Sequence, residues 1–172
     1  MIIRLSKALA VCAVALYTTL VVIGNITDYD TNFALIRHVL LMDTIFPEAT
    51  IKYRAIESPT AHHASYIILI ILQTLTAILC WIGGIRLLAN LKNTAANFNR
   101  KKKIAIAGLT LGFLTWQVLF MSLGREWFGM WMSEWNSGAE AFQVYTTILL
   151  VLIYLVHRDR DRNREREHNE MK

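Results

Sequence analysis

The sequence has few residues that interrupt a helix, because it contains only two prolines in 172 residues and both lie outside its long apolar segments. Those segments also lack any acidic or basic residue near their middle. A soluble helix needs a polar face toward water, and stretches such as AVCAVALYTTLVVIG have none. These absences exclude a soluble helical bundle and favour helices that cross a membrane.

Cysteine is equally scarce, and its spacing carries no metal or redox signature. Cys12 and Cys80 both fall within apolar segments, where a thiol behaves as a small hydrophobe. The sequence contains no phosphate-binding loop, no HExxH and no recognisable nucleophile motif. Because no carboxylate or lysine lies mid-membrane, a proton relay or an ion-coupled carrier also lacks its usual groups. These absences favour a protein without enzymatic activity.

The main feature of the sequence is that its apolar segments are long. The chain is 55% hydrophobic, and four segments reach about the 20 residues that a helix needs to cross a bilayer, at 5–24, 64–88, 104–123 and 139–156. No small-residue cleavage site follows VVIGN, so we expect the first segment to be retained as an anchor. The sequence therefore predicts an all-α, polytopic membrane protein. Its four-helix transmembrane domain covers 1–156, and a charged tail follows at 157–172.

The distribution of basic residues predicts the orientation of these spans. The connection 89–103 has five basic residues and no acid, and Arg4 and Lys7 precede the first span. Acids outnumber bases in the segments 25–63 and 124–138. Since lysine and arginine mark the cytoplasmic side, we expect both termini in the cytoplasm. The tail nets only about +1, so we expect it to be solvated, and we expect no nucleic-acid partner.

The outer segment 25–63 is expected to have structure of its own, because it is long for a connection. Its stretch TNFALIRHVLLMDTIFP places Phe33, Ile36 and Leu40 on one helical face. This run is too short to span, and it predicts a short interfacial or re-entrant helix. Further on, Ser58 and Pro59 are typical of the start of a helix that runs into the second span.

The outer segment 124–138 contains three of the five tryptophans, in GREWFGMWMSEWNSG. Trp127, Trp131 and Trp135 are four residues apart, so on a helix they would form one aromatic ridge. Two interpretations stay open: an interfacial belt among lipid headgroups, and a lid over the outer mouth of the bundle. In the lid, Trp131 would be the most buried of the three.

Polar side chains concentrate in the outer halves of spans two, three and four. Gln73, Gln117 and Gln143 lie there, and because lipid cannot satisfy an amide, we expect them to face other helices. The inner halves carry Gly83 and Gly108, which predict close helix packing. A lid over the glutamines would enclose a ligand site with the candidate residues Trp127, Trp131, Trp135, Arg125, Glu126, Gln73, Gln117 and Gln143.

Arg125 and Glu126 lie at the end of the third span, where partial dehydration strengthens ion pairs. We expect Arg125 to pair with an acid of the segment 25–63, either Asp43 or Glu57. Such a pair would tie the two outer segments together.

Two alternatives use the histidines on the outer side. Four side chains could ligate a metal ion or supply an axial ligand to haem b: His38, His62, His63 and Asp43. His62 and His63 point about 100° apart on a helix, so the two rarely serve one ion. A small membrane enzyme is the second alternative, with Glu126 or Asp43 as a base beside His38 or His63.

Four blocks of the chain carry a family resemblance: NITDYDTNFALIRHVLLMDTIFP, SPTAHHASY, GLTLGFLTWQ and GREWFGMWMSEWNSGAEAF. They resemble a bacterial family of predicted small integral membrane proteins of unknown function, from about the first span through the fourth. The resemblance implies a bacterial inner-membrane protein with four helices, and it implies no reaction, ligand or site.

The function predicted from the sequence is therefore non-enzymatic. We expect an accessory subunit, or a protein that binds a lipid, quinone or other small apolar ligand at its outer face. Membrane lipids are the expected partners, with a larger membrane complex or a homo-oligomer as alternatives. We expect no cofactor, and haem b or a metal ion is the alternative.

Overall fold

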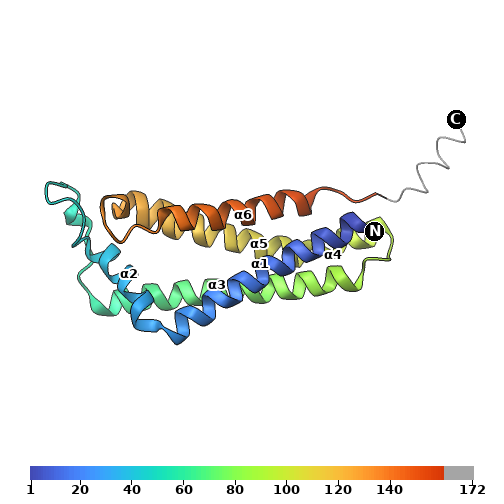
Figure 1. The fold of residues 1–172 in the computed structure, drawn as a ribbon, viewed down its shortest axis with the longest axis horizontal. Coiled ribbons are helices and arrows are strands. Elements are labelled where there is room, and N and C mark those ends of the chain that lie inside the picture. The colour runs from blue at the N-terminus through green and yellow to red at the C-terminus, as the bar shows by residue number, and fades with distance from the viewer. Residues whose placement is uncertain (161–172) are drawn as a thin grey trace, which may run out of the picture.

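The apolar segments fold into four long helices that lie along one common direction (Figure 1), in a computed structural model that describes residues 1–160. The first two spans are α1 (Ile2–Thr27) and α3 (Pro59–Ala89), and the fourth is α6 (Gly138–Val156). The third consists of α5 (Lys103–Leu114) and its continuation η2 (Thr115–Trp127). No strand occurs within residues 1–160, so the predicted all-α, four-span fold class is confirmed.

Short helices occupy the connections. They are α2 (Tyr29–Leu41), η1 (Lys52–Arg54), α4 (Ala95–Lys101) and η3 (Met130–Met132). The interfacial helix expected within 25–63 is α2, and it ends where Met42 adopts a left-handed backbone conformation with φ 51°. As expected, the Ser58 hydroxyl accepts a hydrogen bond from the Ala61 N–H at the start of α3, and Pro59 occupies its first turn.

The helices pack in the order α1, α3, α5, α6, and α6 also contacts η2. The main core is made of small and aliphatic side chains that are almost completely buried between them, among them Ala8, Val11, Ala15, Cys80, Leu87, Leu109 and Ile148. Outside this core, large aliphatic side chains cover the outer faces of the helices: Leu9, Leu16, Leu20, Ile71, Ile78, Leu150 and Ile153 are each more than a third exposed. Such a surface suits hydrocarbon and not water.

Glycines allow α3 and α5 to approach each other closely. A Cβ added to Gly83 would lie 2.6 Å from the Cα atom of Ala105, and one added to Gly108 would lie 2.9 Å from the backbone nitrogen of Cys80. The two backbones are therefore in direct contact along the inner half of the spans. The predicted close packing of these glycines is confirmed.

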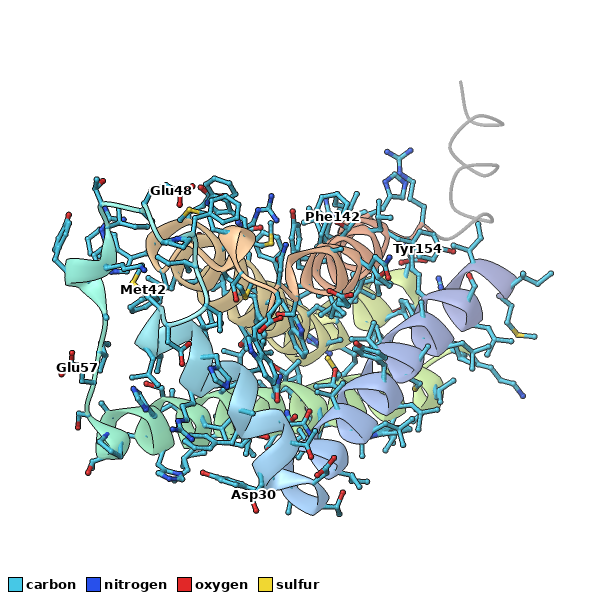
Figure 2. All side chains as sticks on the ribbon, turned by 60° about the vertical axis from the view of Figure 1, so that its left-hand side comes forward. Asp30, Met42, Glu48, Glu57, Phe142 and Tyr154 are labelled. Carbon is cyan, nitrogen blue, oxygen red and sulfur yellow. The ribbon has the colours of Figure 1, made fainter. Side chains whose placement is uncertain are left out.

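Irregular structure is confined to the two ends of the bundle. At one end, α2 and the segments 42–58 and 128–137 form what we call the cap (Figure 1). At the other end, which we call the basic end, the start of α1, α4 and residues 157–160 lie together. Asp30, Glu48 and Glu57 are exposed on the cap (Figure 2).

The first residues after α6 differ from the solvated tail that the sequence predicts. Asp159 is only 6% exposed and forms ion pairs with Lys7 at 3.0 Å and Lys102 at 2.6 Å. Two basic residues of distant segments meet at this carboxylate, which the sequence pattern of the tail alone does not reveal. The remainder of the predicted tail, 161–172, lies outside the described residues.

The close contact of α3 and α5 can be tested with one methyl group. Gly83→Ala should lower the free energy of unfolding by about 1–3 kcal/mol, because the new Cβ would overlap the backbone of Ala105. Gly24→Ala is the matched control in α1, since a Cβ there meets nothing within 4 Å. The control should be neutral or stabilising by up to about 1 kcal/mol. Thermal unfolding of the purified proteins in detergent measures both, and equal effects would contradict the packing.

Candidate functional site

The third span changes its winding at Thr115, where α5 gives way to η2, a π-helix that ends at Trp127. A π-helix bonds each N–H five residues back, so residues four or five apart come onto the same face. Leu119, Leu123 and Trp127, each four residues apart, therefore share one side, with Phe120 and Gly124 beside them. Segments of π-helix are frequent at functional sites.

A pocket of about 420 Å³ lies between this face of η2 and the two helices α2 and α3. No acidic or basic side chain lines it, and its most polar lining side chain is the Ser65 hydroxyl. The lining consists of Leu35, Ile36, Val39 and Leu40 from α2, Ser65, Ile68 and Leu69 from α3, Leu119, Phe120, Leu123, Gly124 and Trp127 from η2, and Ile56, Phe128 and Met130 from the cap segments.

The cap has a small core of its own that holds α2 over this pocket. Leu40, Met42, Ile45 and Phe128 are buried together. The N–H of Ile56 donates to the carbonyl oxygen of Leu40 at 2.8 Å, which joins the end of α2 to the far side of the segment 42–58. Because α2 is attached at both ends, its apolar face forms a wall of the pocket and does not separate from the bundle.

Each tryptophan of the segment 124–138 contacts a different part of the segment 25–63. The guanidinium of Arg54 lies 4.4 Å from the centroid of the Trp127 ring, and its Nη1 donates to the Trp127 carbonyl oxygen at 3.1 Å. Trp131 meets Phe46 edge to face at 6.1 Å. Trp135 stacks on His38 at 4.6 Å between centroids. These three contacts join the two outer segments.

The aromatic ridge predicted from the four-residue spacing is wrong. The π-helix ends at Trp127, Gly129 takes a left-handed conformation with φ 67°, and only a short 3-10 turn follows. The three indoles therefore do not share one helix. Trp131 is 49% exposed and Trp127 50% exposed, whereas Trp135 is partly buried, so Trp131 is not the most buried of the three. Of these indoles, the pocket includes only that of Trp127.

None of the three candidate glutamines lines the pocket. Gln73 is 1% exposed and faces α1, where its Oε1 accepts a hydrogen bond from Asn25 Nδ2 at 2.7 Å. Gln117 is partly buried, and Gln143 is exposed on α6. Because α3 presents Gln73 to α1 and Leu69 to the pocket, the outer-half glutamines do not converge as the lid hypothesis expects.

The predicted pairing of Arg125 with Asp43 or Glu57 is wrong. Arg125 Nε lies 3.6 Å from the carboxylate of its neighbour Glu126, which is 71% exposed, and such a pair contributes little. The Arg125 side chain extends toward the start of α6, beside Gly138. Among the basic residues of the two outer segments, it is Arg54 that joins them, through Trp127.

The histidines proposed as metal ligands have separate partners. His38 Nδ1 lies 2.9 Å from Asp43, and the nearly buried His62 contacts a backbone carbonyl of the cap at 2.6 Å through Nε2. His63 contacts the Tyr29 hydroxyl at 2.9 Å. Within residues 1–160, no three His, Cys, Asp or Glu side chains lie close enough to hold a metal ion. The geometry therefore does not assemble the predicted metal site.

The pair His38–Asp43 is the part of the enzyme hypothesis that the structure does assemble. Asp43 follows the left-handed Met42 and turns back toward the last turn of α2. An ionised carboxylate only accepts hydrogen bonds, so His38 Nδ1 is the donor. Neither residue lines the pocket. The pair therefore lies at the end of α2, outside the lining of the pocket.

Sequence reasoning missed most residues of the pocket, although part of the signal was present. Leu35, Ile36, Val39 and Leu40 recur with helical spacing on α2, and this apolar stripe predicts a buried face. The lining from η2 has the same spacing at Leu119, Phe120, Leu123 and Gly124, but within a membrane span an apolar stripe does not by itself predict a buried face, because lipid-facing side chains are apolar too.

The chain also matches the model of a protein family. The family model described as "Predicted small integral membrane protein (DUF2165)" matches residues 3–158. The chain belongs to this family. The match extends from the start of α1 to the residues just after α6, and so covers the four spans and the cap of this chain. The family description supports an integral membrane protein and names no reaction or ligand. No curated protein and no solved structure matches the chain.

The ring contacts of the cap can be ranked by substitution. Trp135→Leu should destabilise the protein more than Trp131→Leu, because Trp135 is partly buried in a stack on His38 whereas Trp131 is half exposed. The expected difference is about 0.5–1.5 kcal/mol, which an aromatic pair adds beyond its buried area. Thermal unfolding in detergent measures it. A larger loss for Trp131→Leu would show that Trp131, and not Trp135, anchors the segment 128–137.

Proposed function

We propose that this chain is a non-enzymatic protein of the bacterial inner membrane that binds one apolar chain, the acyl or isoprenoid part of a lipid-like molecule, beneath its cap. The observation that carries this proposal is the pocket of about 420 Å³ with its apolar lining. Its volume falls in the range of about 300–1,000 Å³ that is typical of small-molecule sites. The π-helical wall is the local irregularity that makes room for it.

Access to the pocket from the bilayer supports a ligand that is already dissolved in the membrane. Two lining residues on neighbouring walls, Ile68 of α3 and Leu123 of η2, are 53% and 43% exposed. They lie in the apolar spans, where the surroundings are hydrocarbon. An apolar chain moving from lipid into the pocket gains little from the hydrophobic effect. Its selectivity must come from shape and from its polar end.

The polar end of such a molecule would lie beside Arg54. The guanidinium of Arg54 lies over Trp127, and Trp127 lines the pocket where it meets the cap. A carbonyl or phosphate oxygen at this position would find a cation in a partly dehydrated place. The ligand would then span the pocket with its chain directed between α2 and η2.

Two observations favour binding over catalysis. No acidic, basic or histidine side chain lines the pocket, so a bound molecule would meet no acid or base there, and the Ser65 hydroxyl has no base among the lining residues to activate it. The one carboxylate–imidazole pair of the cap, His38–Asp43, lies away from the lining and serves the end of α2. Along the apolar lining, affinity depends on packing, and Arg54 is the charged group that a polar end would meet.

Obstruction of the pocket tests the proposal. The wild type, purified from its native membrane in mild detergent, should carry an apolar molecule enriched over the bulk lipids, identified by mass spectrometry of an organic extract. Ser65→Phe should lose it, because the phenyl ring would fill space that the Ser65 hydroxyl leaves open in the pocket. Loss of most of the signal is expected at an unchanged unfolding temperature.

Ala64→Phe is the matched control, since Ala64 is the exposed neighbour on the same helix and does not line the pocket. This variant should keep the molecule. A wild type that carries no enriched apolar molecule would reject ligand binding. A partner protein retained at constant stoichiometry in place of such a molecule would favour an accessory subunit.

The proposal places the cap outside and the basic end in the cytoplasm. The fold supports this orientation, because three basic segments separated along the chain meet at one end of the bundle. Lysine and arginine favour the cytoplasmic side of the inner membrane. The acids of the cap, including Glu48 and Glu57 (Figure 2), are on the opposite side.

A reporter enzyme that is active only outside the cytoplasm tests the orientation directly. Fusions after Ile56 or Trp135, both in the cap, should be active, and a fusion after Ala96 in α4 should be inactive. The fusion at Ala96 is the internal control because it lies at the other end of the same helices. Activity at Ala96 with none at Ile56 would invert the orientation.

A further inference from the structure

A second pocket, of about 960 Å³, lies at the basic end of the bundle. It is bounded by the start of α1, by residues 91 and 92, and by residues 157–160. Its charged lining consists of the bases Arg4, Lys7, Lys92, Arg158 and Arg160 and the single acid Asp159. This strongly positive lining distinguishes it from the apolar pocket beneath the cap.

The wall of this pocket contains a buried surplus of positive charge. Lys7 and Lys102 are 1% and 3% exposed, and both ammonium groups contact the same carboxylate oxygen of Asp159. Both also donate to the carbonyl oxygen of His157, at 2.7 Å and 2.8 Å. One carboxylate therefore forms ion pairs with two ammonium groups. A buried surplus of this kind is costly unless a further anion lies nearby.

Asp159 is held in place through its backbone. Asn99 contacts both of its backbone groups, accepting from the Asp159 N–H at 3.1 Å and donating to the Asp159 carbonyl oxygen at 2.9 Å. Burial acts to raise the pKa of Asp159, but hydrogen bonds from Lys102 and Lys7 outweigh it and leave the pKa lowered. The carboxylate is therefore ionised at neutral pH, and its Oδ2 lies within ion-pair distance of both lysines.

Other bases are positioned around the same opening. Arg4 donates from Nη1 to the carbonyl oxygen of Asn93 at 2.6 Å, which holds its guanidinium beside Lys92. Lys92 and Arg158 are exposed side chains that line the pocket from two segments far apart in the chain. Apolar Ile3 and Leu91 line it as well. The lining thus combines bases with apolar surface where the spans meet water.

We infer that the pocket at the basic end binds an anion that carries a phosphate group. Basic pockets between transmembrane helices on the cytoplasmic side suit the headgroups of anionic lipids, and arginine and lysine are the usual partners of phosphate oxygens. Ile3 and Leu91 would lie beside the glycerol and the first methylenes of a lipid, whereas a free phosphate would use only the bases. The site is independent of the ligand pocket beneath the cap.

Thermal stability in the presence of defined anions tests this inference. A short-chain phosphatidylglycerol, titrated into the full chain in neutral detergent, should raise the unfolding temperature with a saturable dependence, because a ligand that binds the folded state stabilises it. Phosphatidylcholine of the same chain length is the zwitterionic comparison and should have little effect. Inorganic phosphate separates the two sources: protection by it alone identifies a free phosphate, and protection by the lipid only identifies a headgroup.

Substitutions at the two exposed bases locate the site. Lys92→Gln with Arg158→Gln should weaken the apparent affinity about fivefold for each base, or about 25-fold for the pair. Arg100→Gln with Lys103→Gln is the matched control, because it removes the same charge from exposed bases of the same end that do not line the pocket. The control should change little. Equal losses of apparent affinity in the two double variants would attribute binding to general surface charge and would overturn the site. A wild type that no anion stabilises would also overturn it.

Discussion

Hydrocarbon offers no hydrogen-bond partner to a peptide group, so the backbone within the spans must bond to itself, and helices result. The same constraint acts on the polar side chains inside the bundle, where threonines such as Thr18 and Thr76 donate to carbonyl oxygens of their own helix and longer side chains find partners on another helix. Gln73 Oε1 accepts a hydrogen bond from Asn25 Nδ2, and the Trp81 indole N–H donates to Thr19 Oγ1 at 3.0 Å. Both bonds join α1 to α3, the pair with the most extensive contact in the fold. Irregular structure is correspondingly confined to the two ends.

The two ends are held together by different forces. At the cap, ring contacts and a small apolar core join segments that are far apart in the chain, and its ionic contacts are exposed. At the basic end, buried ion pairs of Lys7 and Lys102 with Asp159 draw the chain after α6 back onto α1 and α5. Each end consequently has its own kind of pocket, one lined by hydrocarbon and one lined by bases. The transmembrane core connects them and provides no polar site of its own.

The π-helix links the architecture of the bundle to the pocket beneath the cap. Up to Leu114 the third span packs tightly on α3 through Gly108, and after Thr115 the wider winding separates its side chains from that helix. Gly124 adds no side chain at the position where the pocket meets Met130. The position of α3 beside η2 is fixed by its extensive contacts with α1 and α5. A pocket is thus accommodated within a helical span, whose backbone still bonds to itself as hydrocarbon requires.

Properties that depend on neighbouring residues or on the solvent could be predicted from the chain. The four spans, the Ser58 cap and the close approach at Gly83 belong to this group, because hydropathy, capping and the absence of a side chain act locally. The tryptophan ridge failed because its spacing assumed an α-helix through 124–138, whereas the π-helix and the left-handed Gly129 redirect the chain.

By itself, then, the sequence determined the class, the number of spans and the distribution of charge between the two ends. Only the tertiary structure decided that Arg54 and not Arg125 joins the outer segments, that Gln73 faces α1, and that Asp159 is buried. It also decided where the two pockets lie. Each of these features depends on the relative position of residues far apart in the chain, and no local periodicity encodes that position.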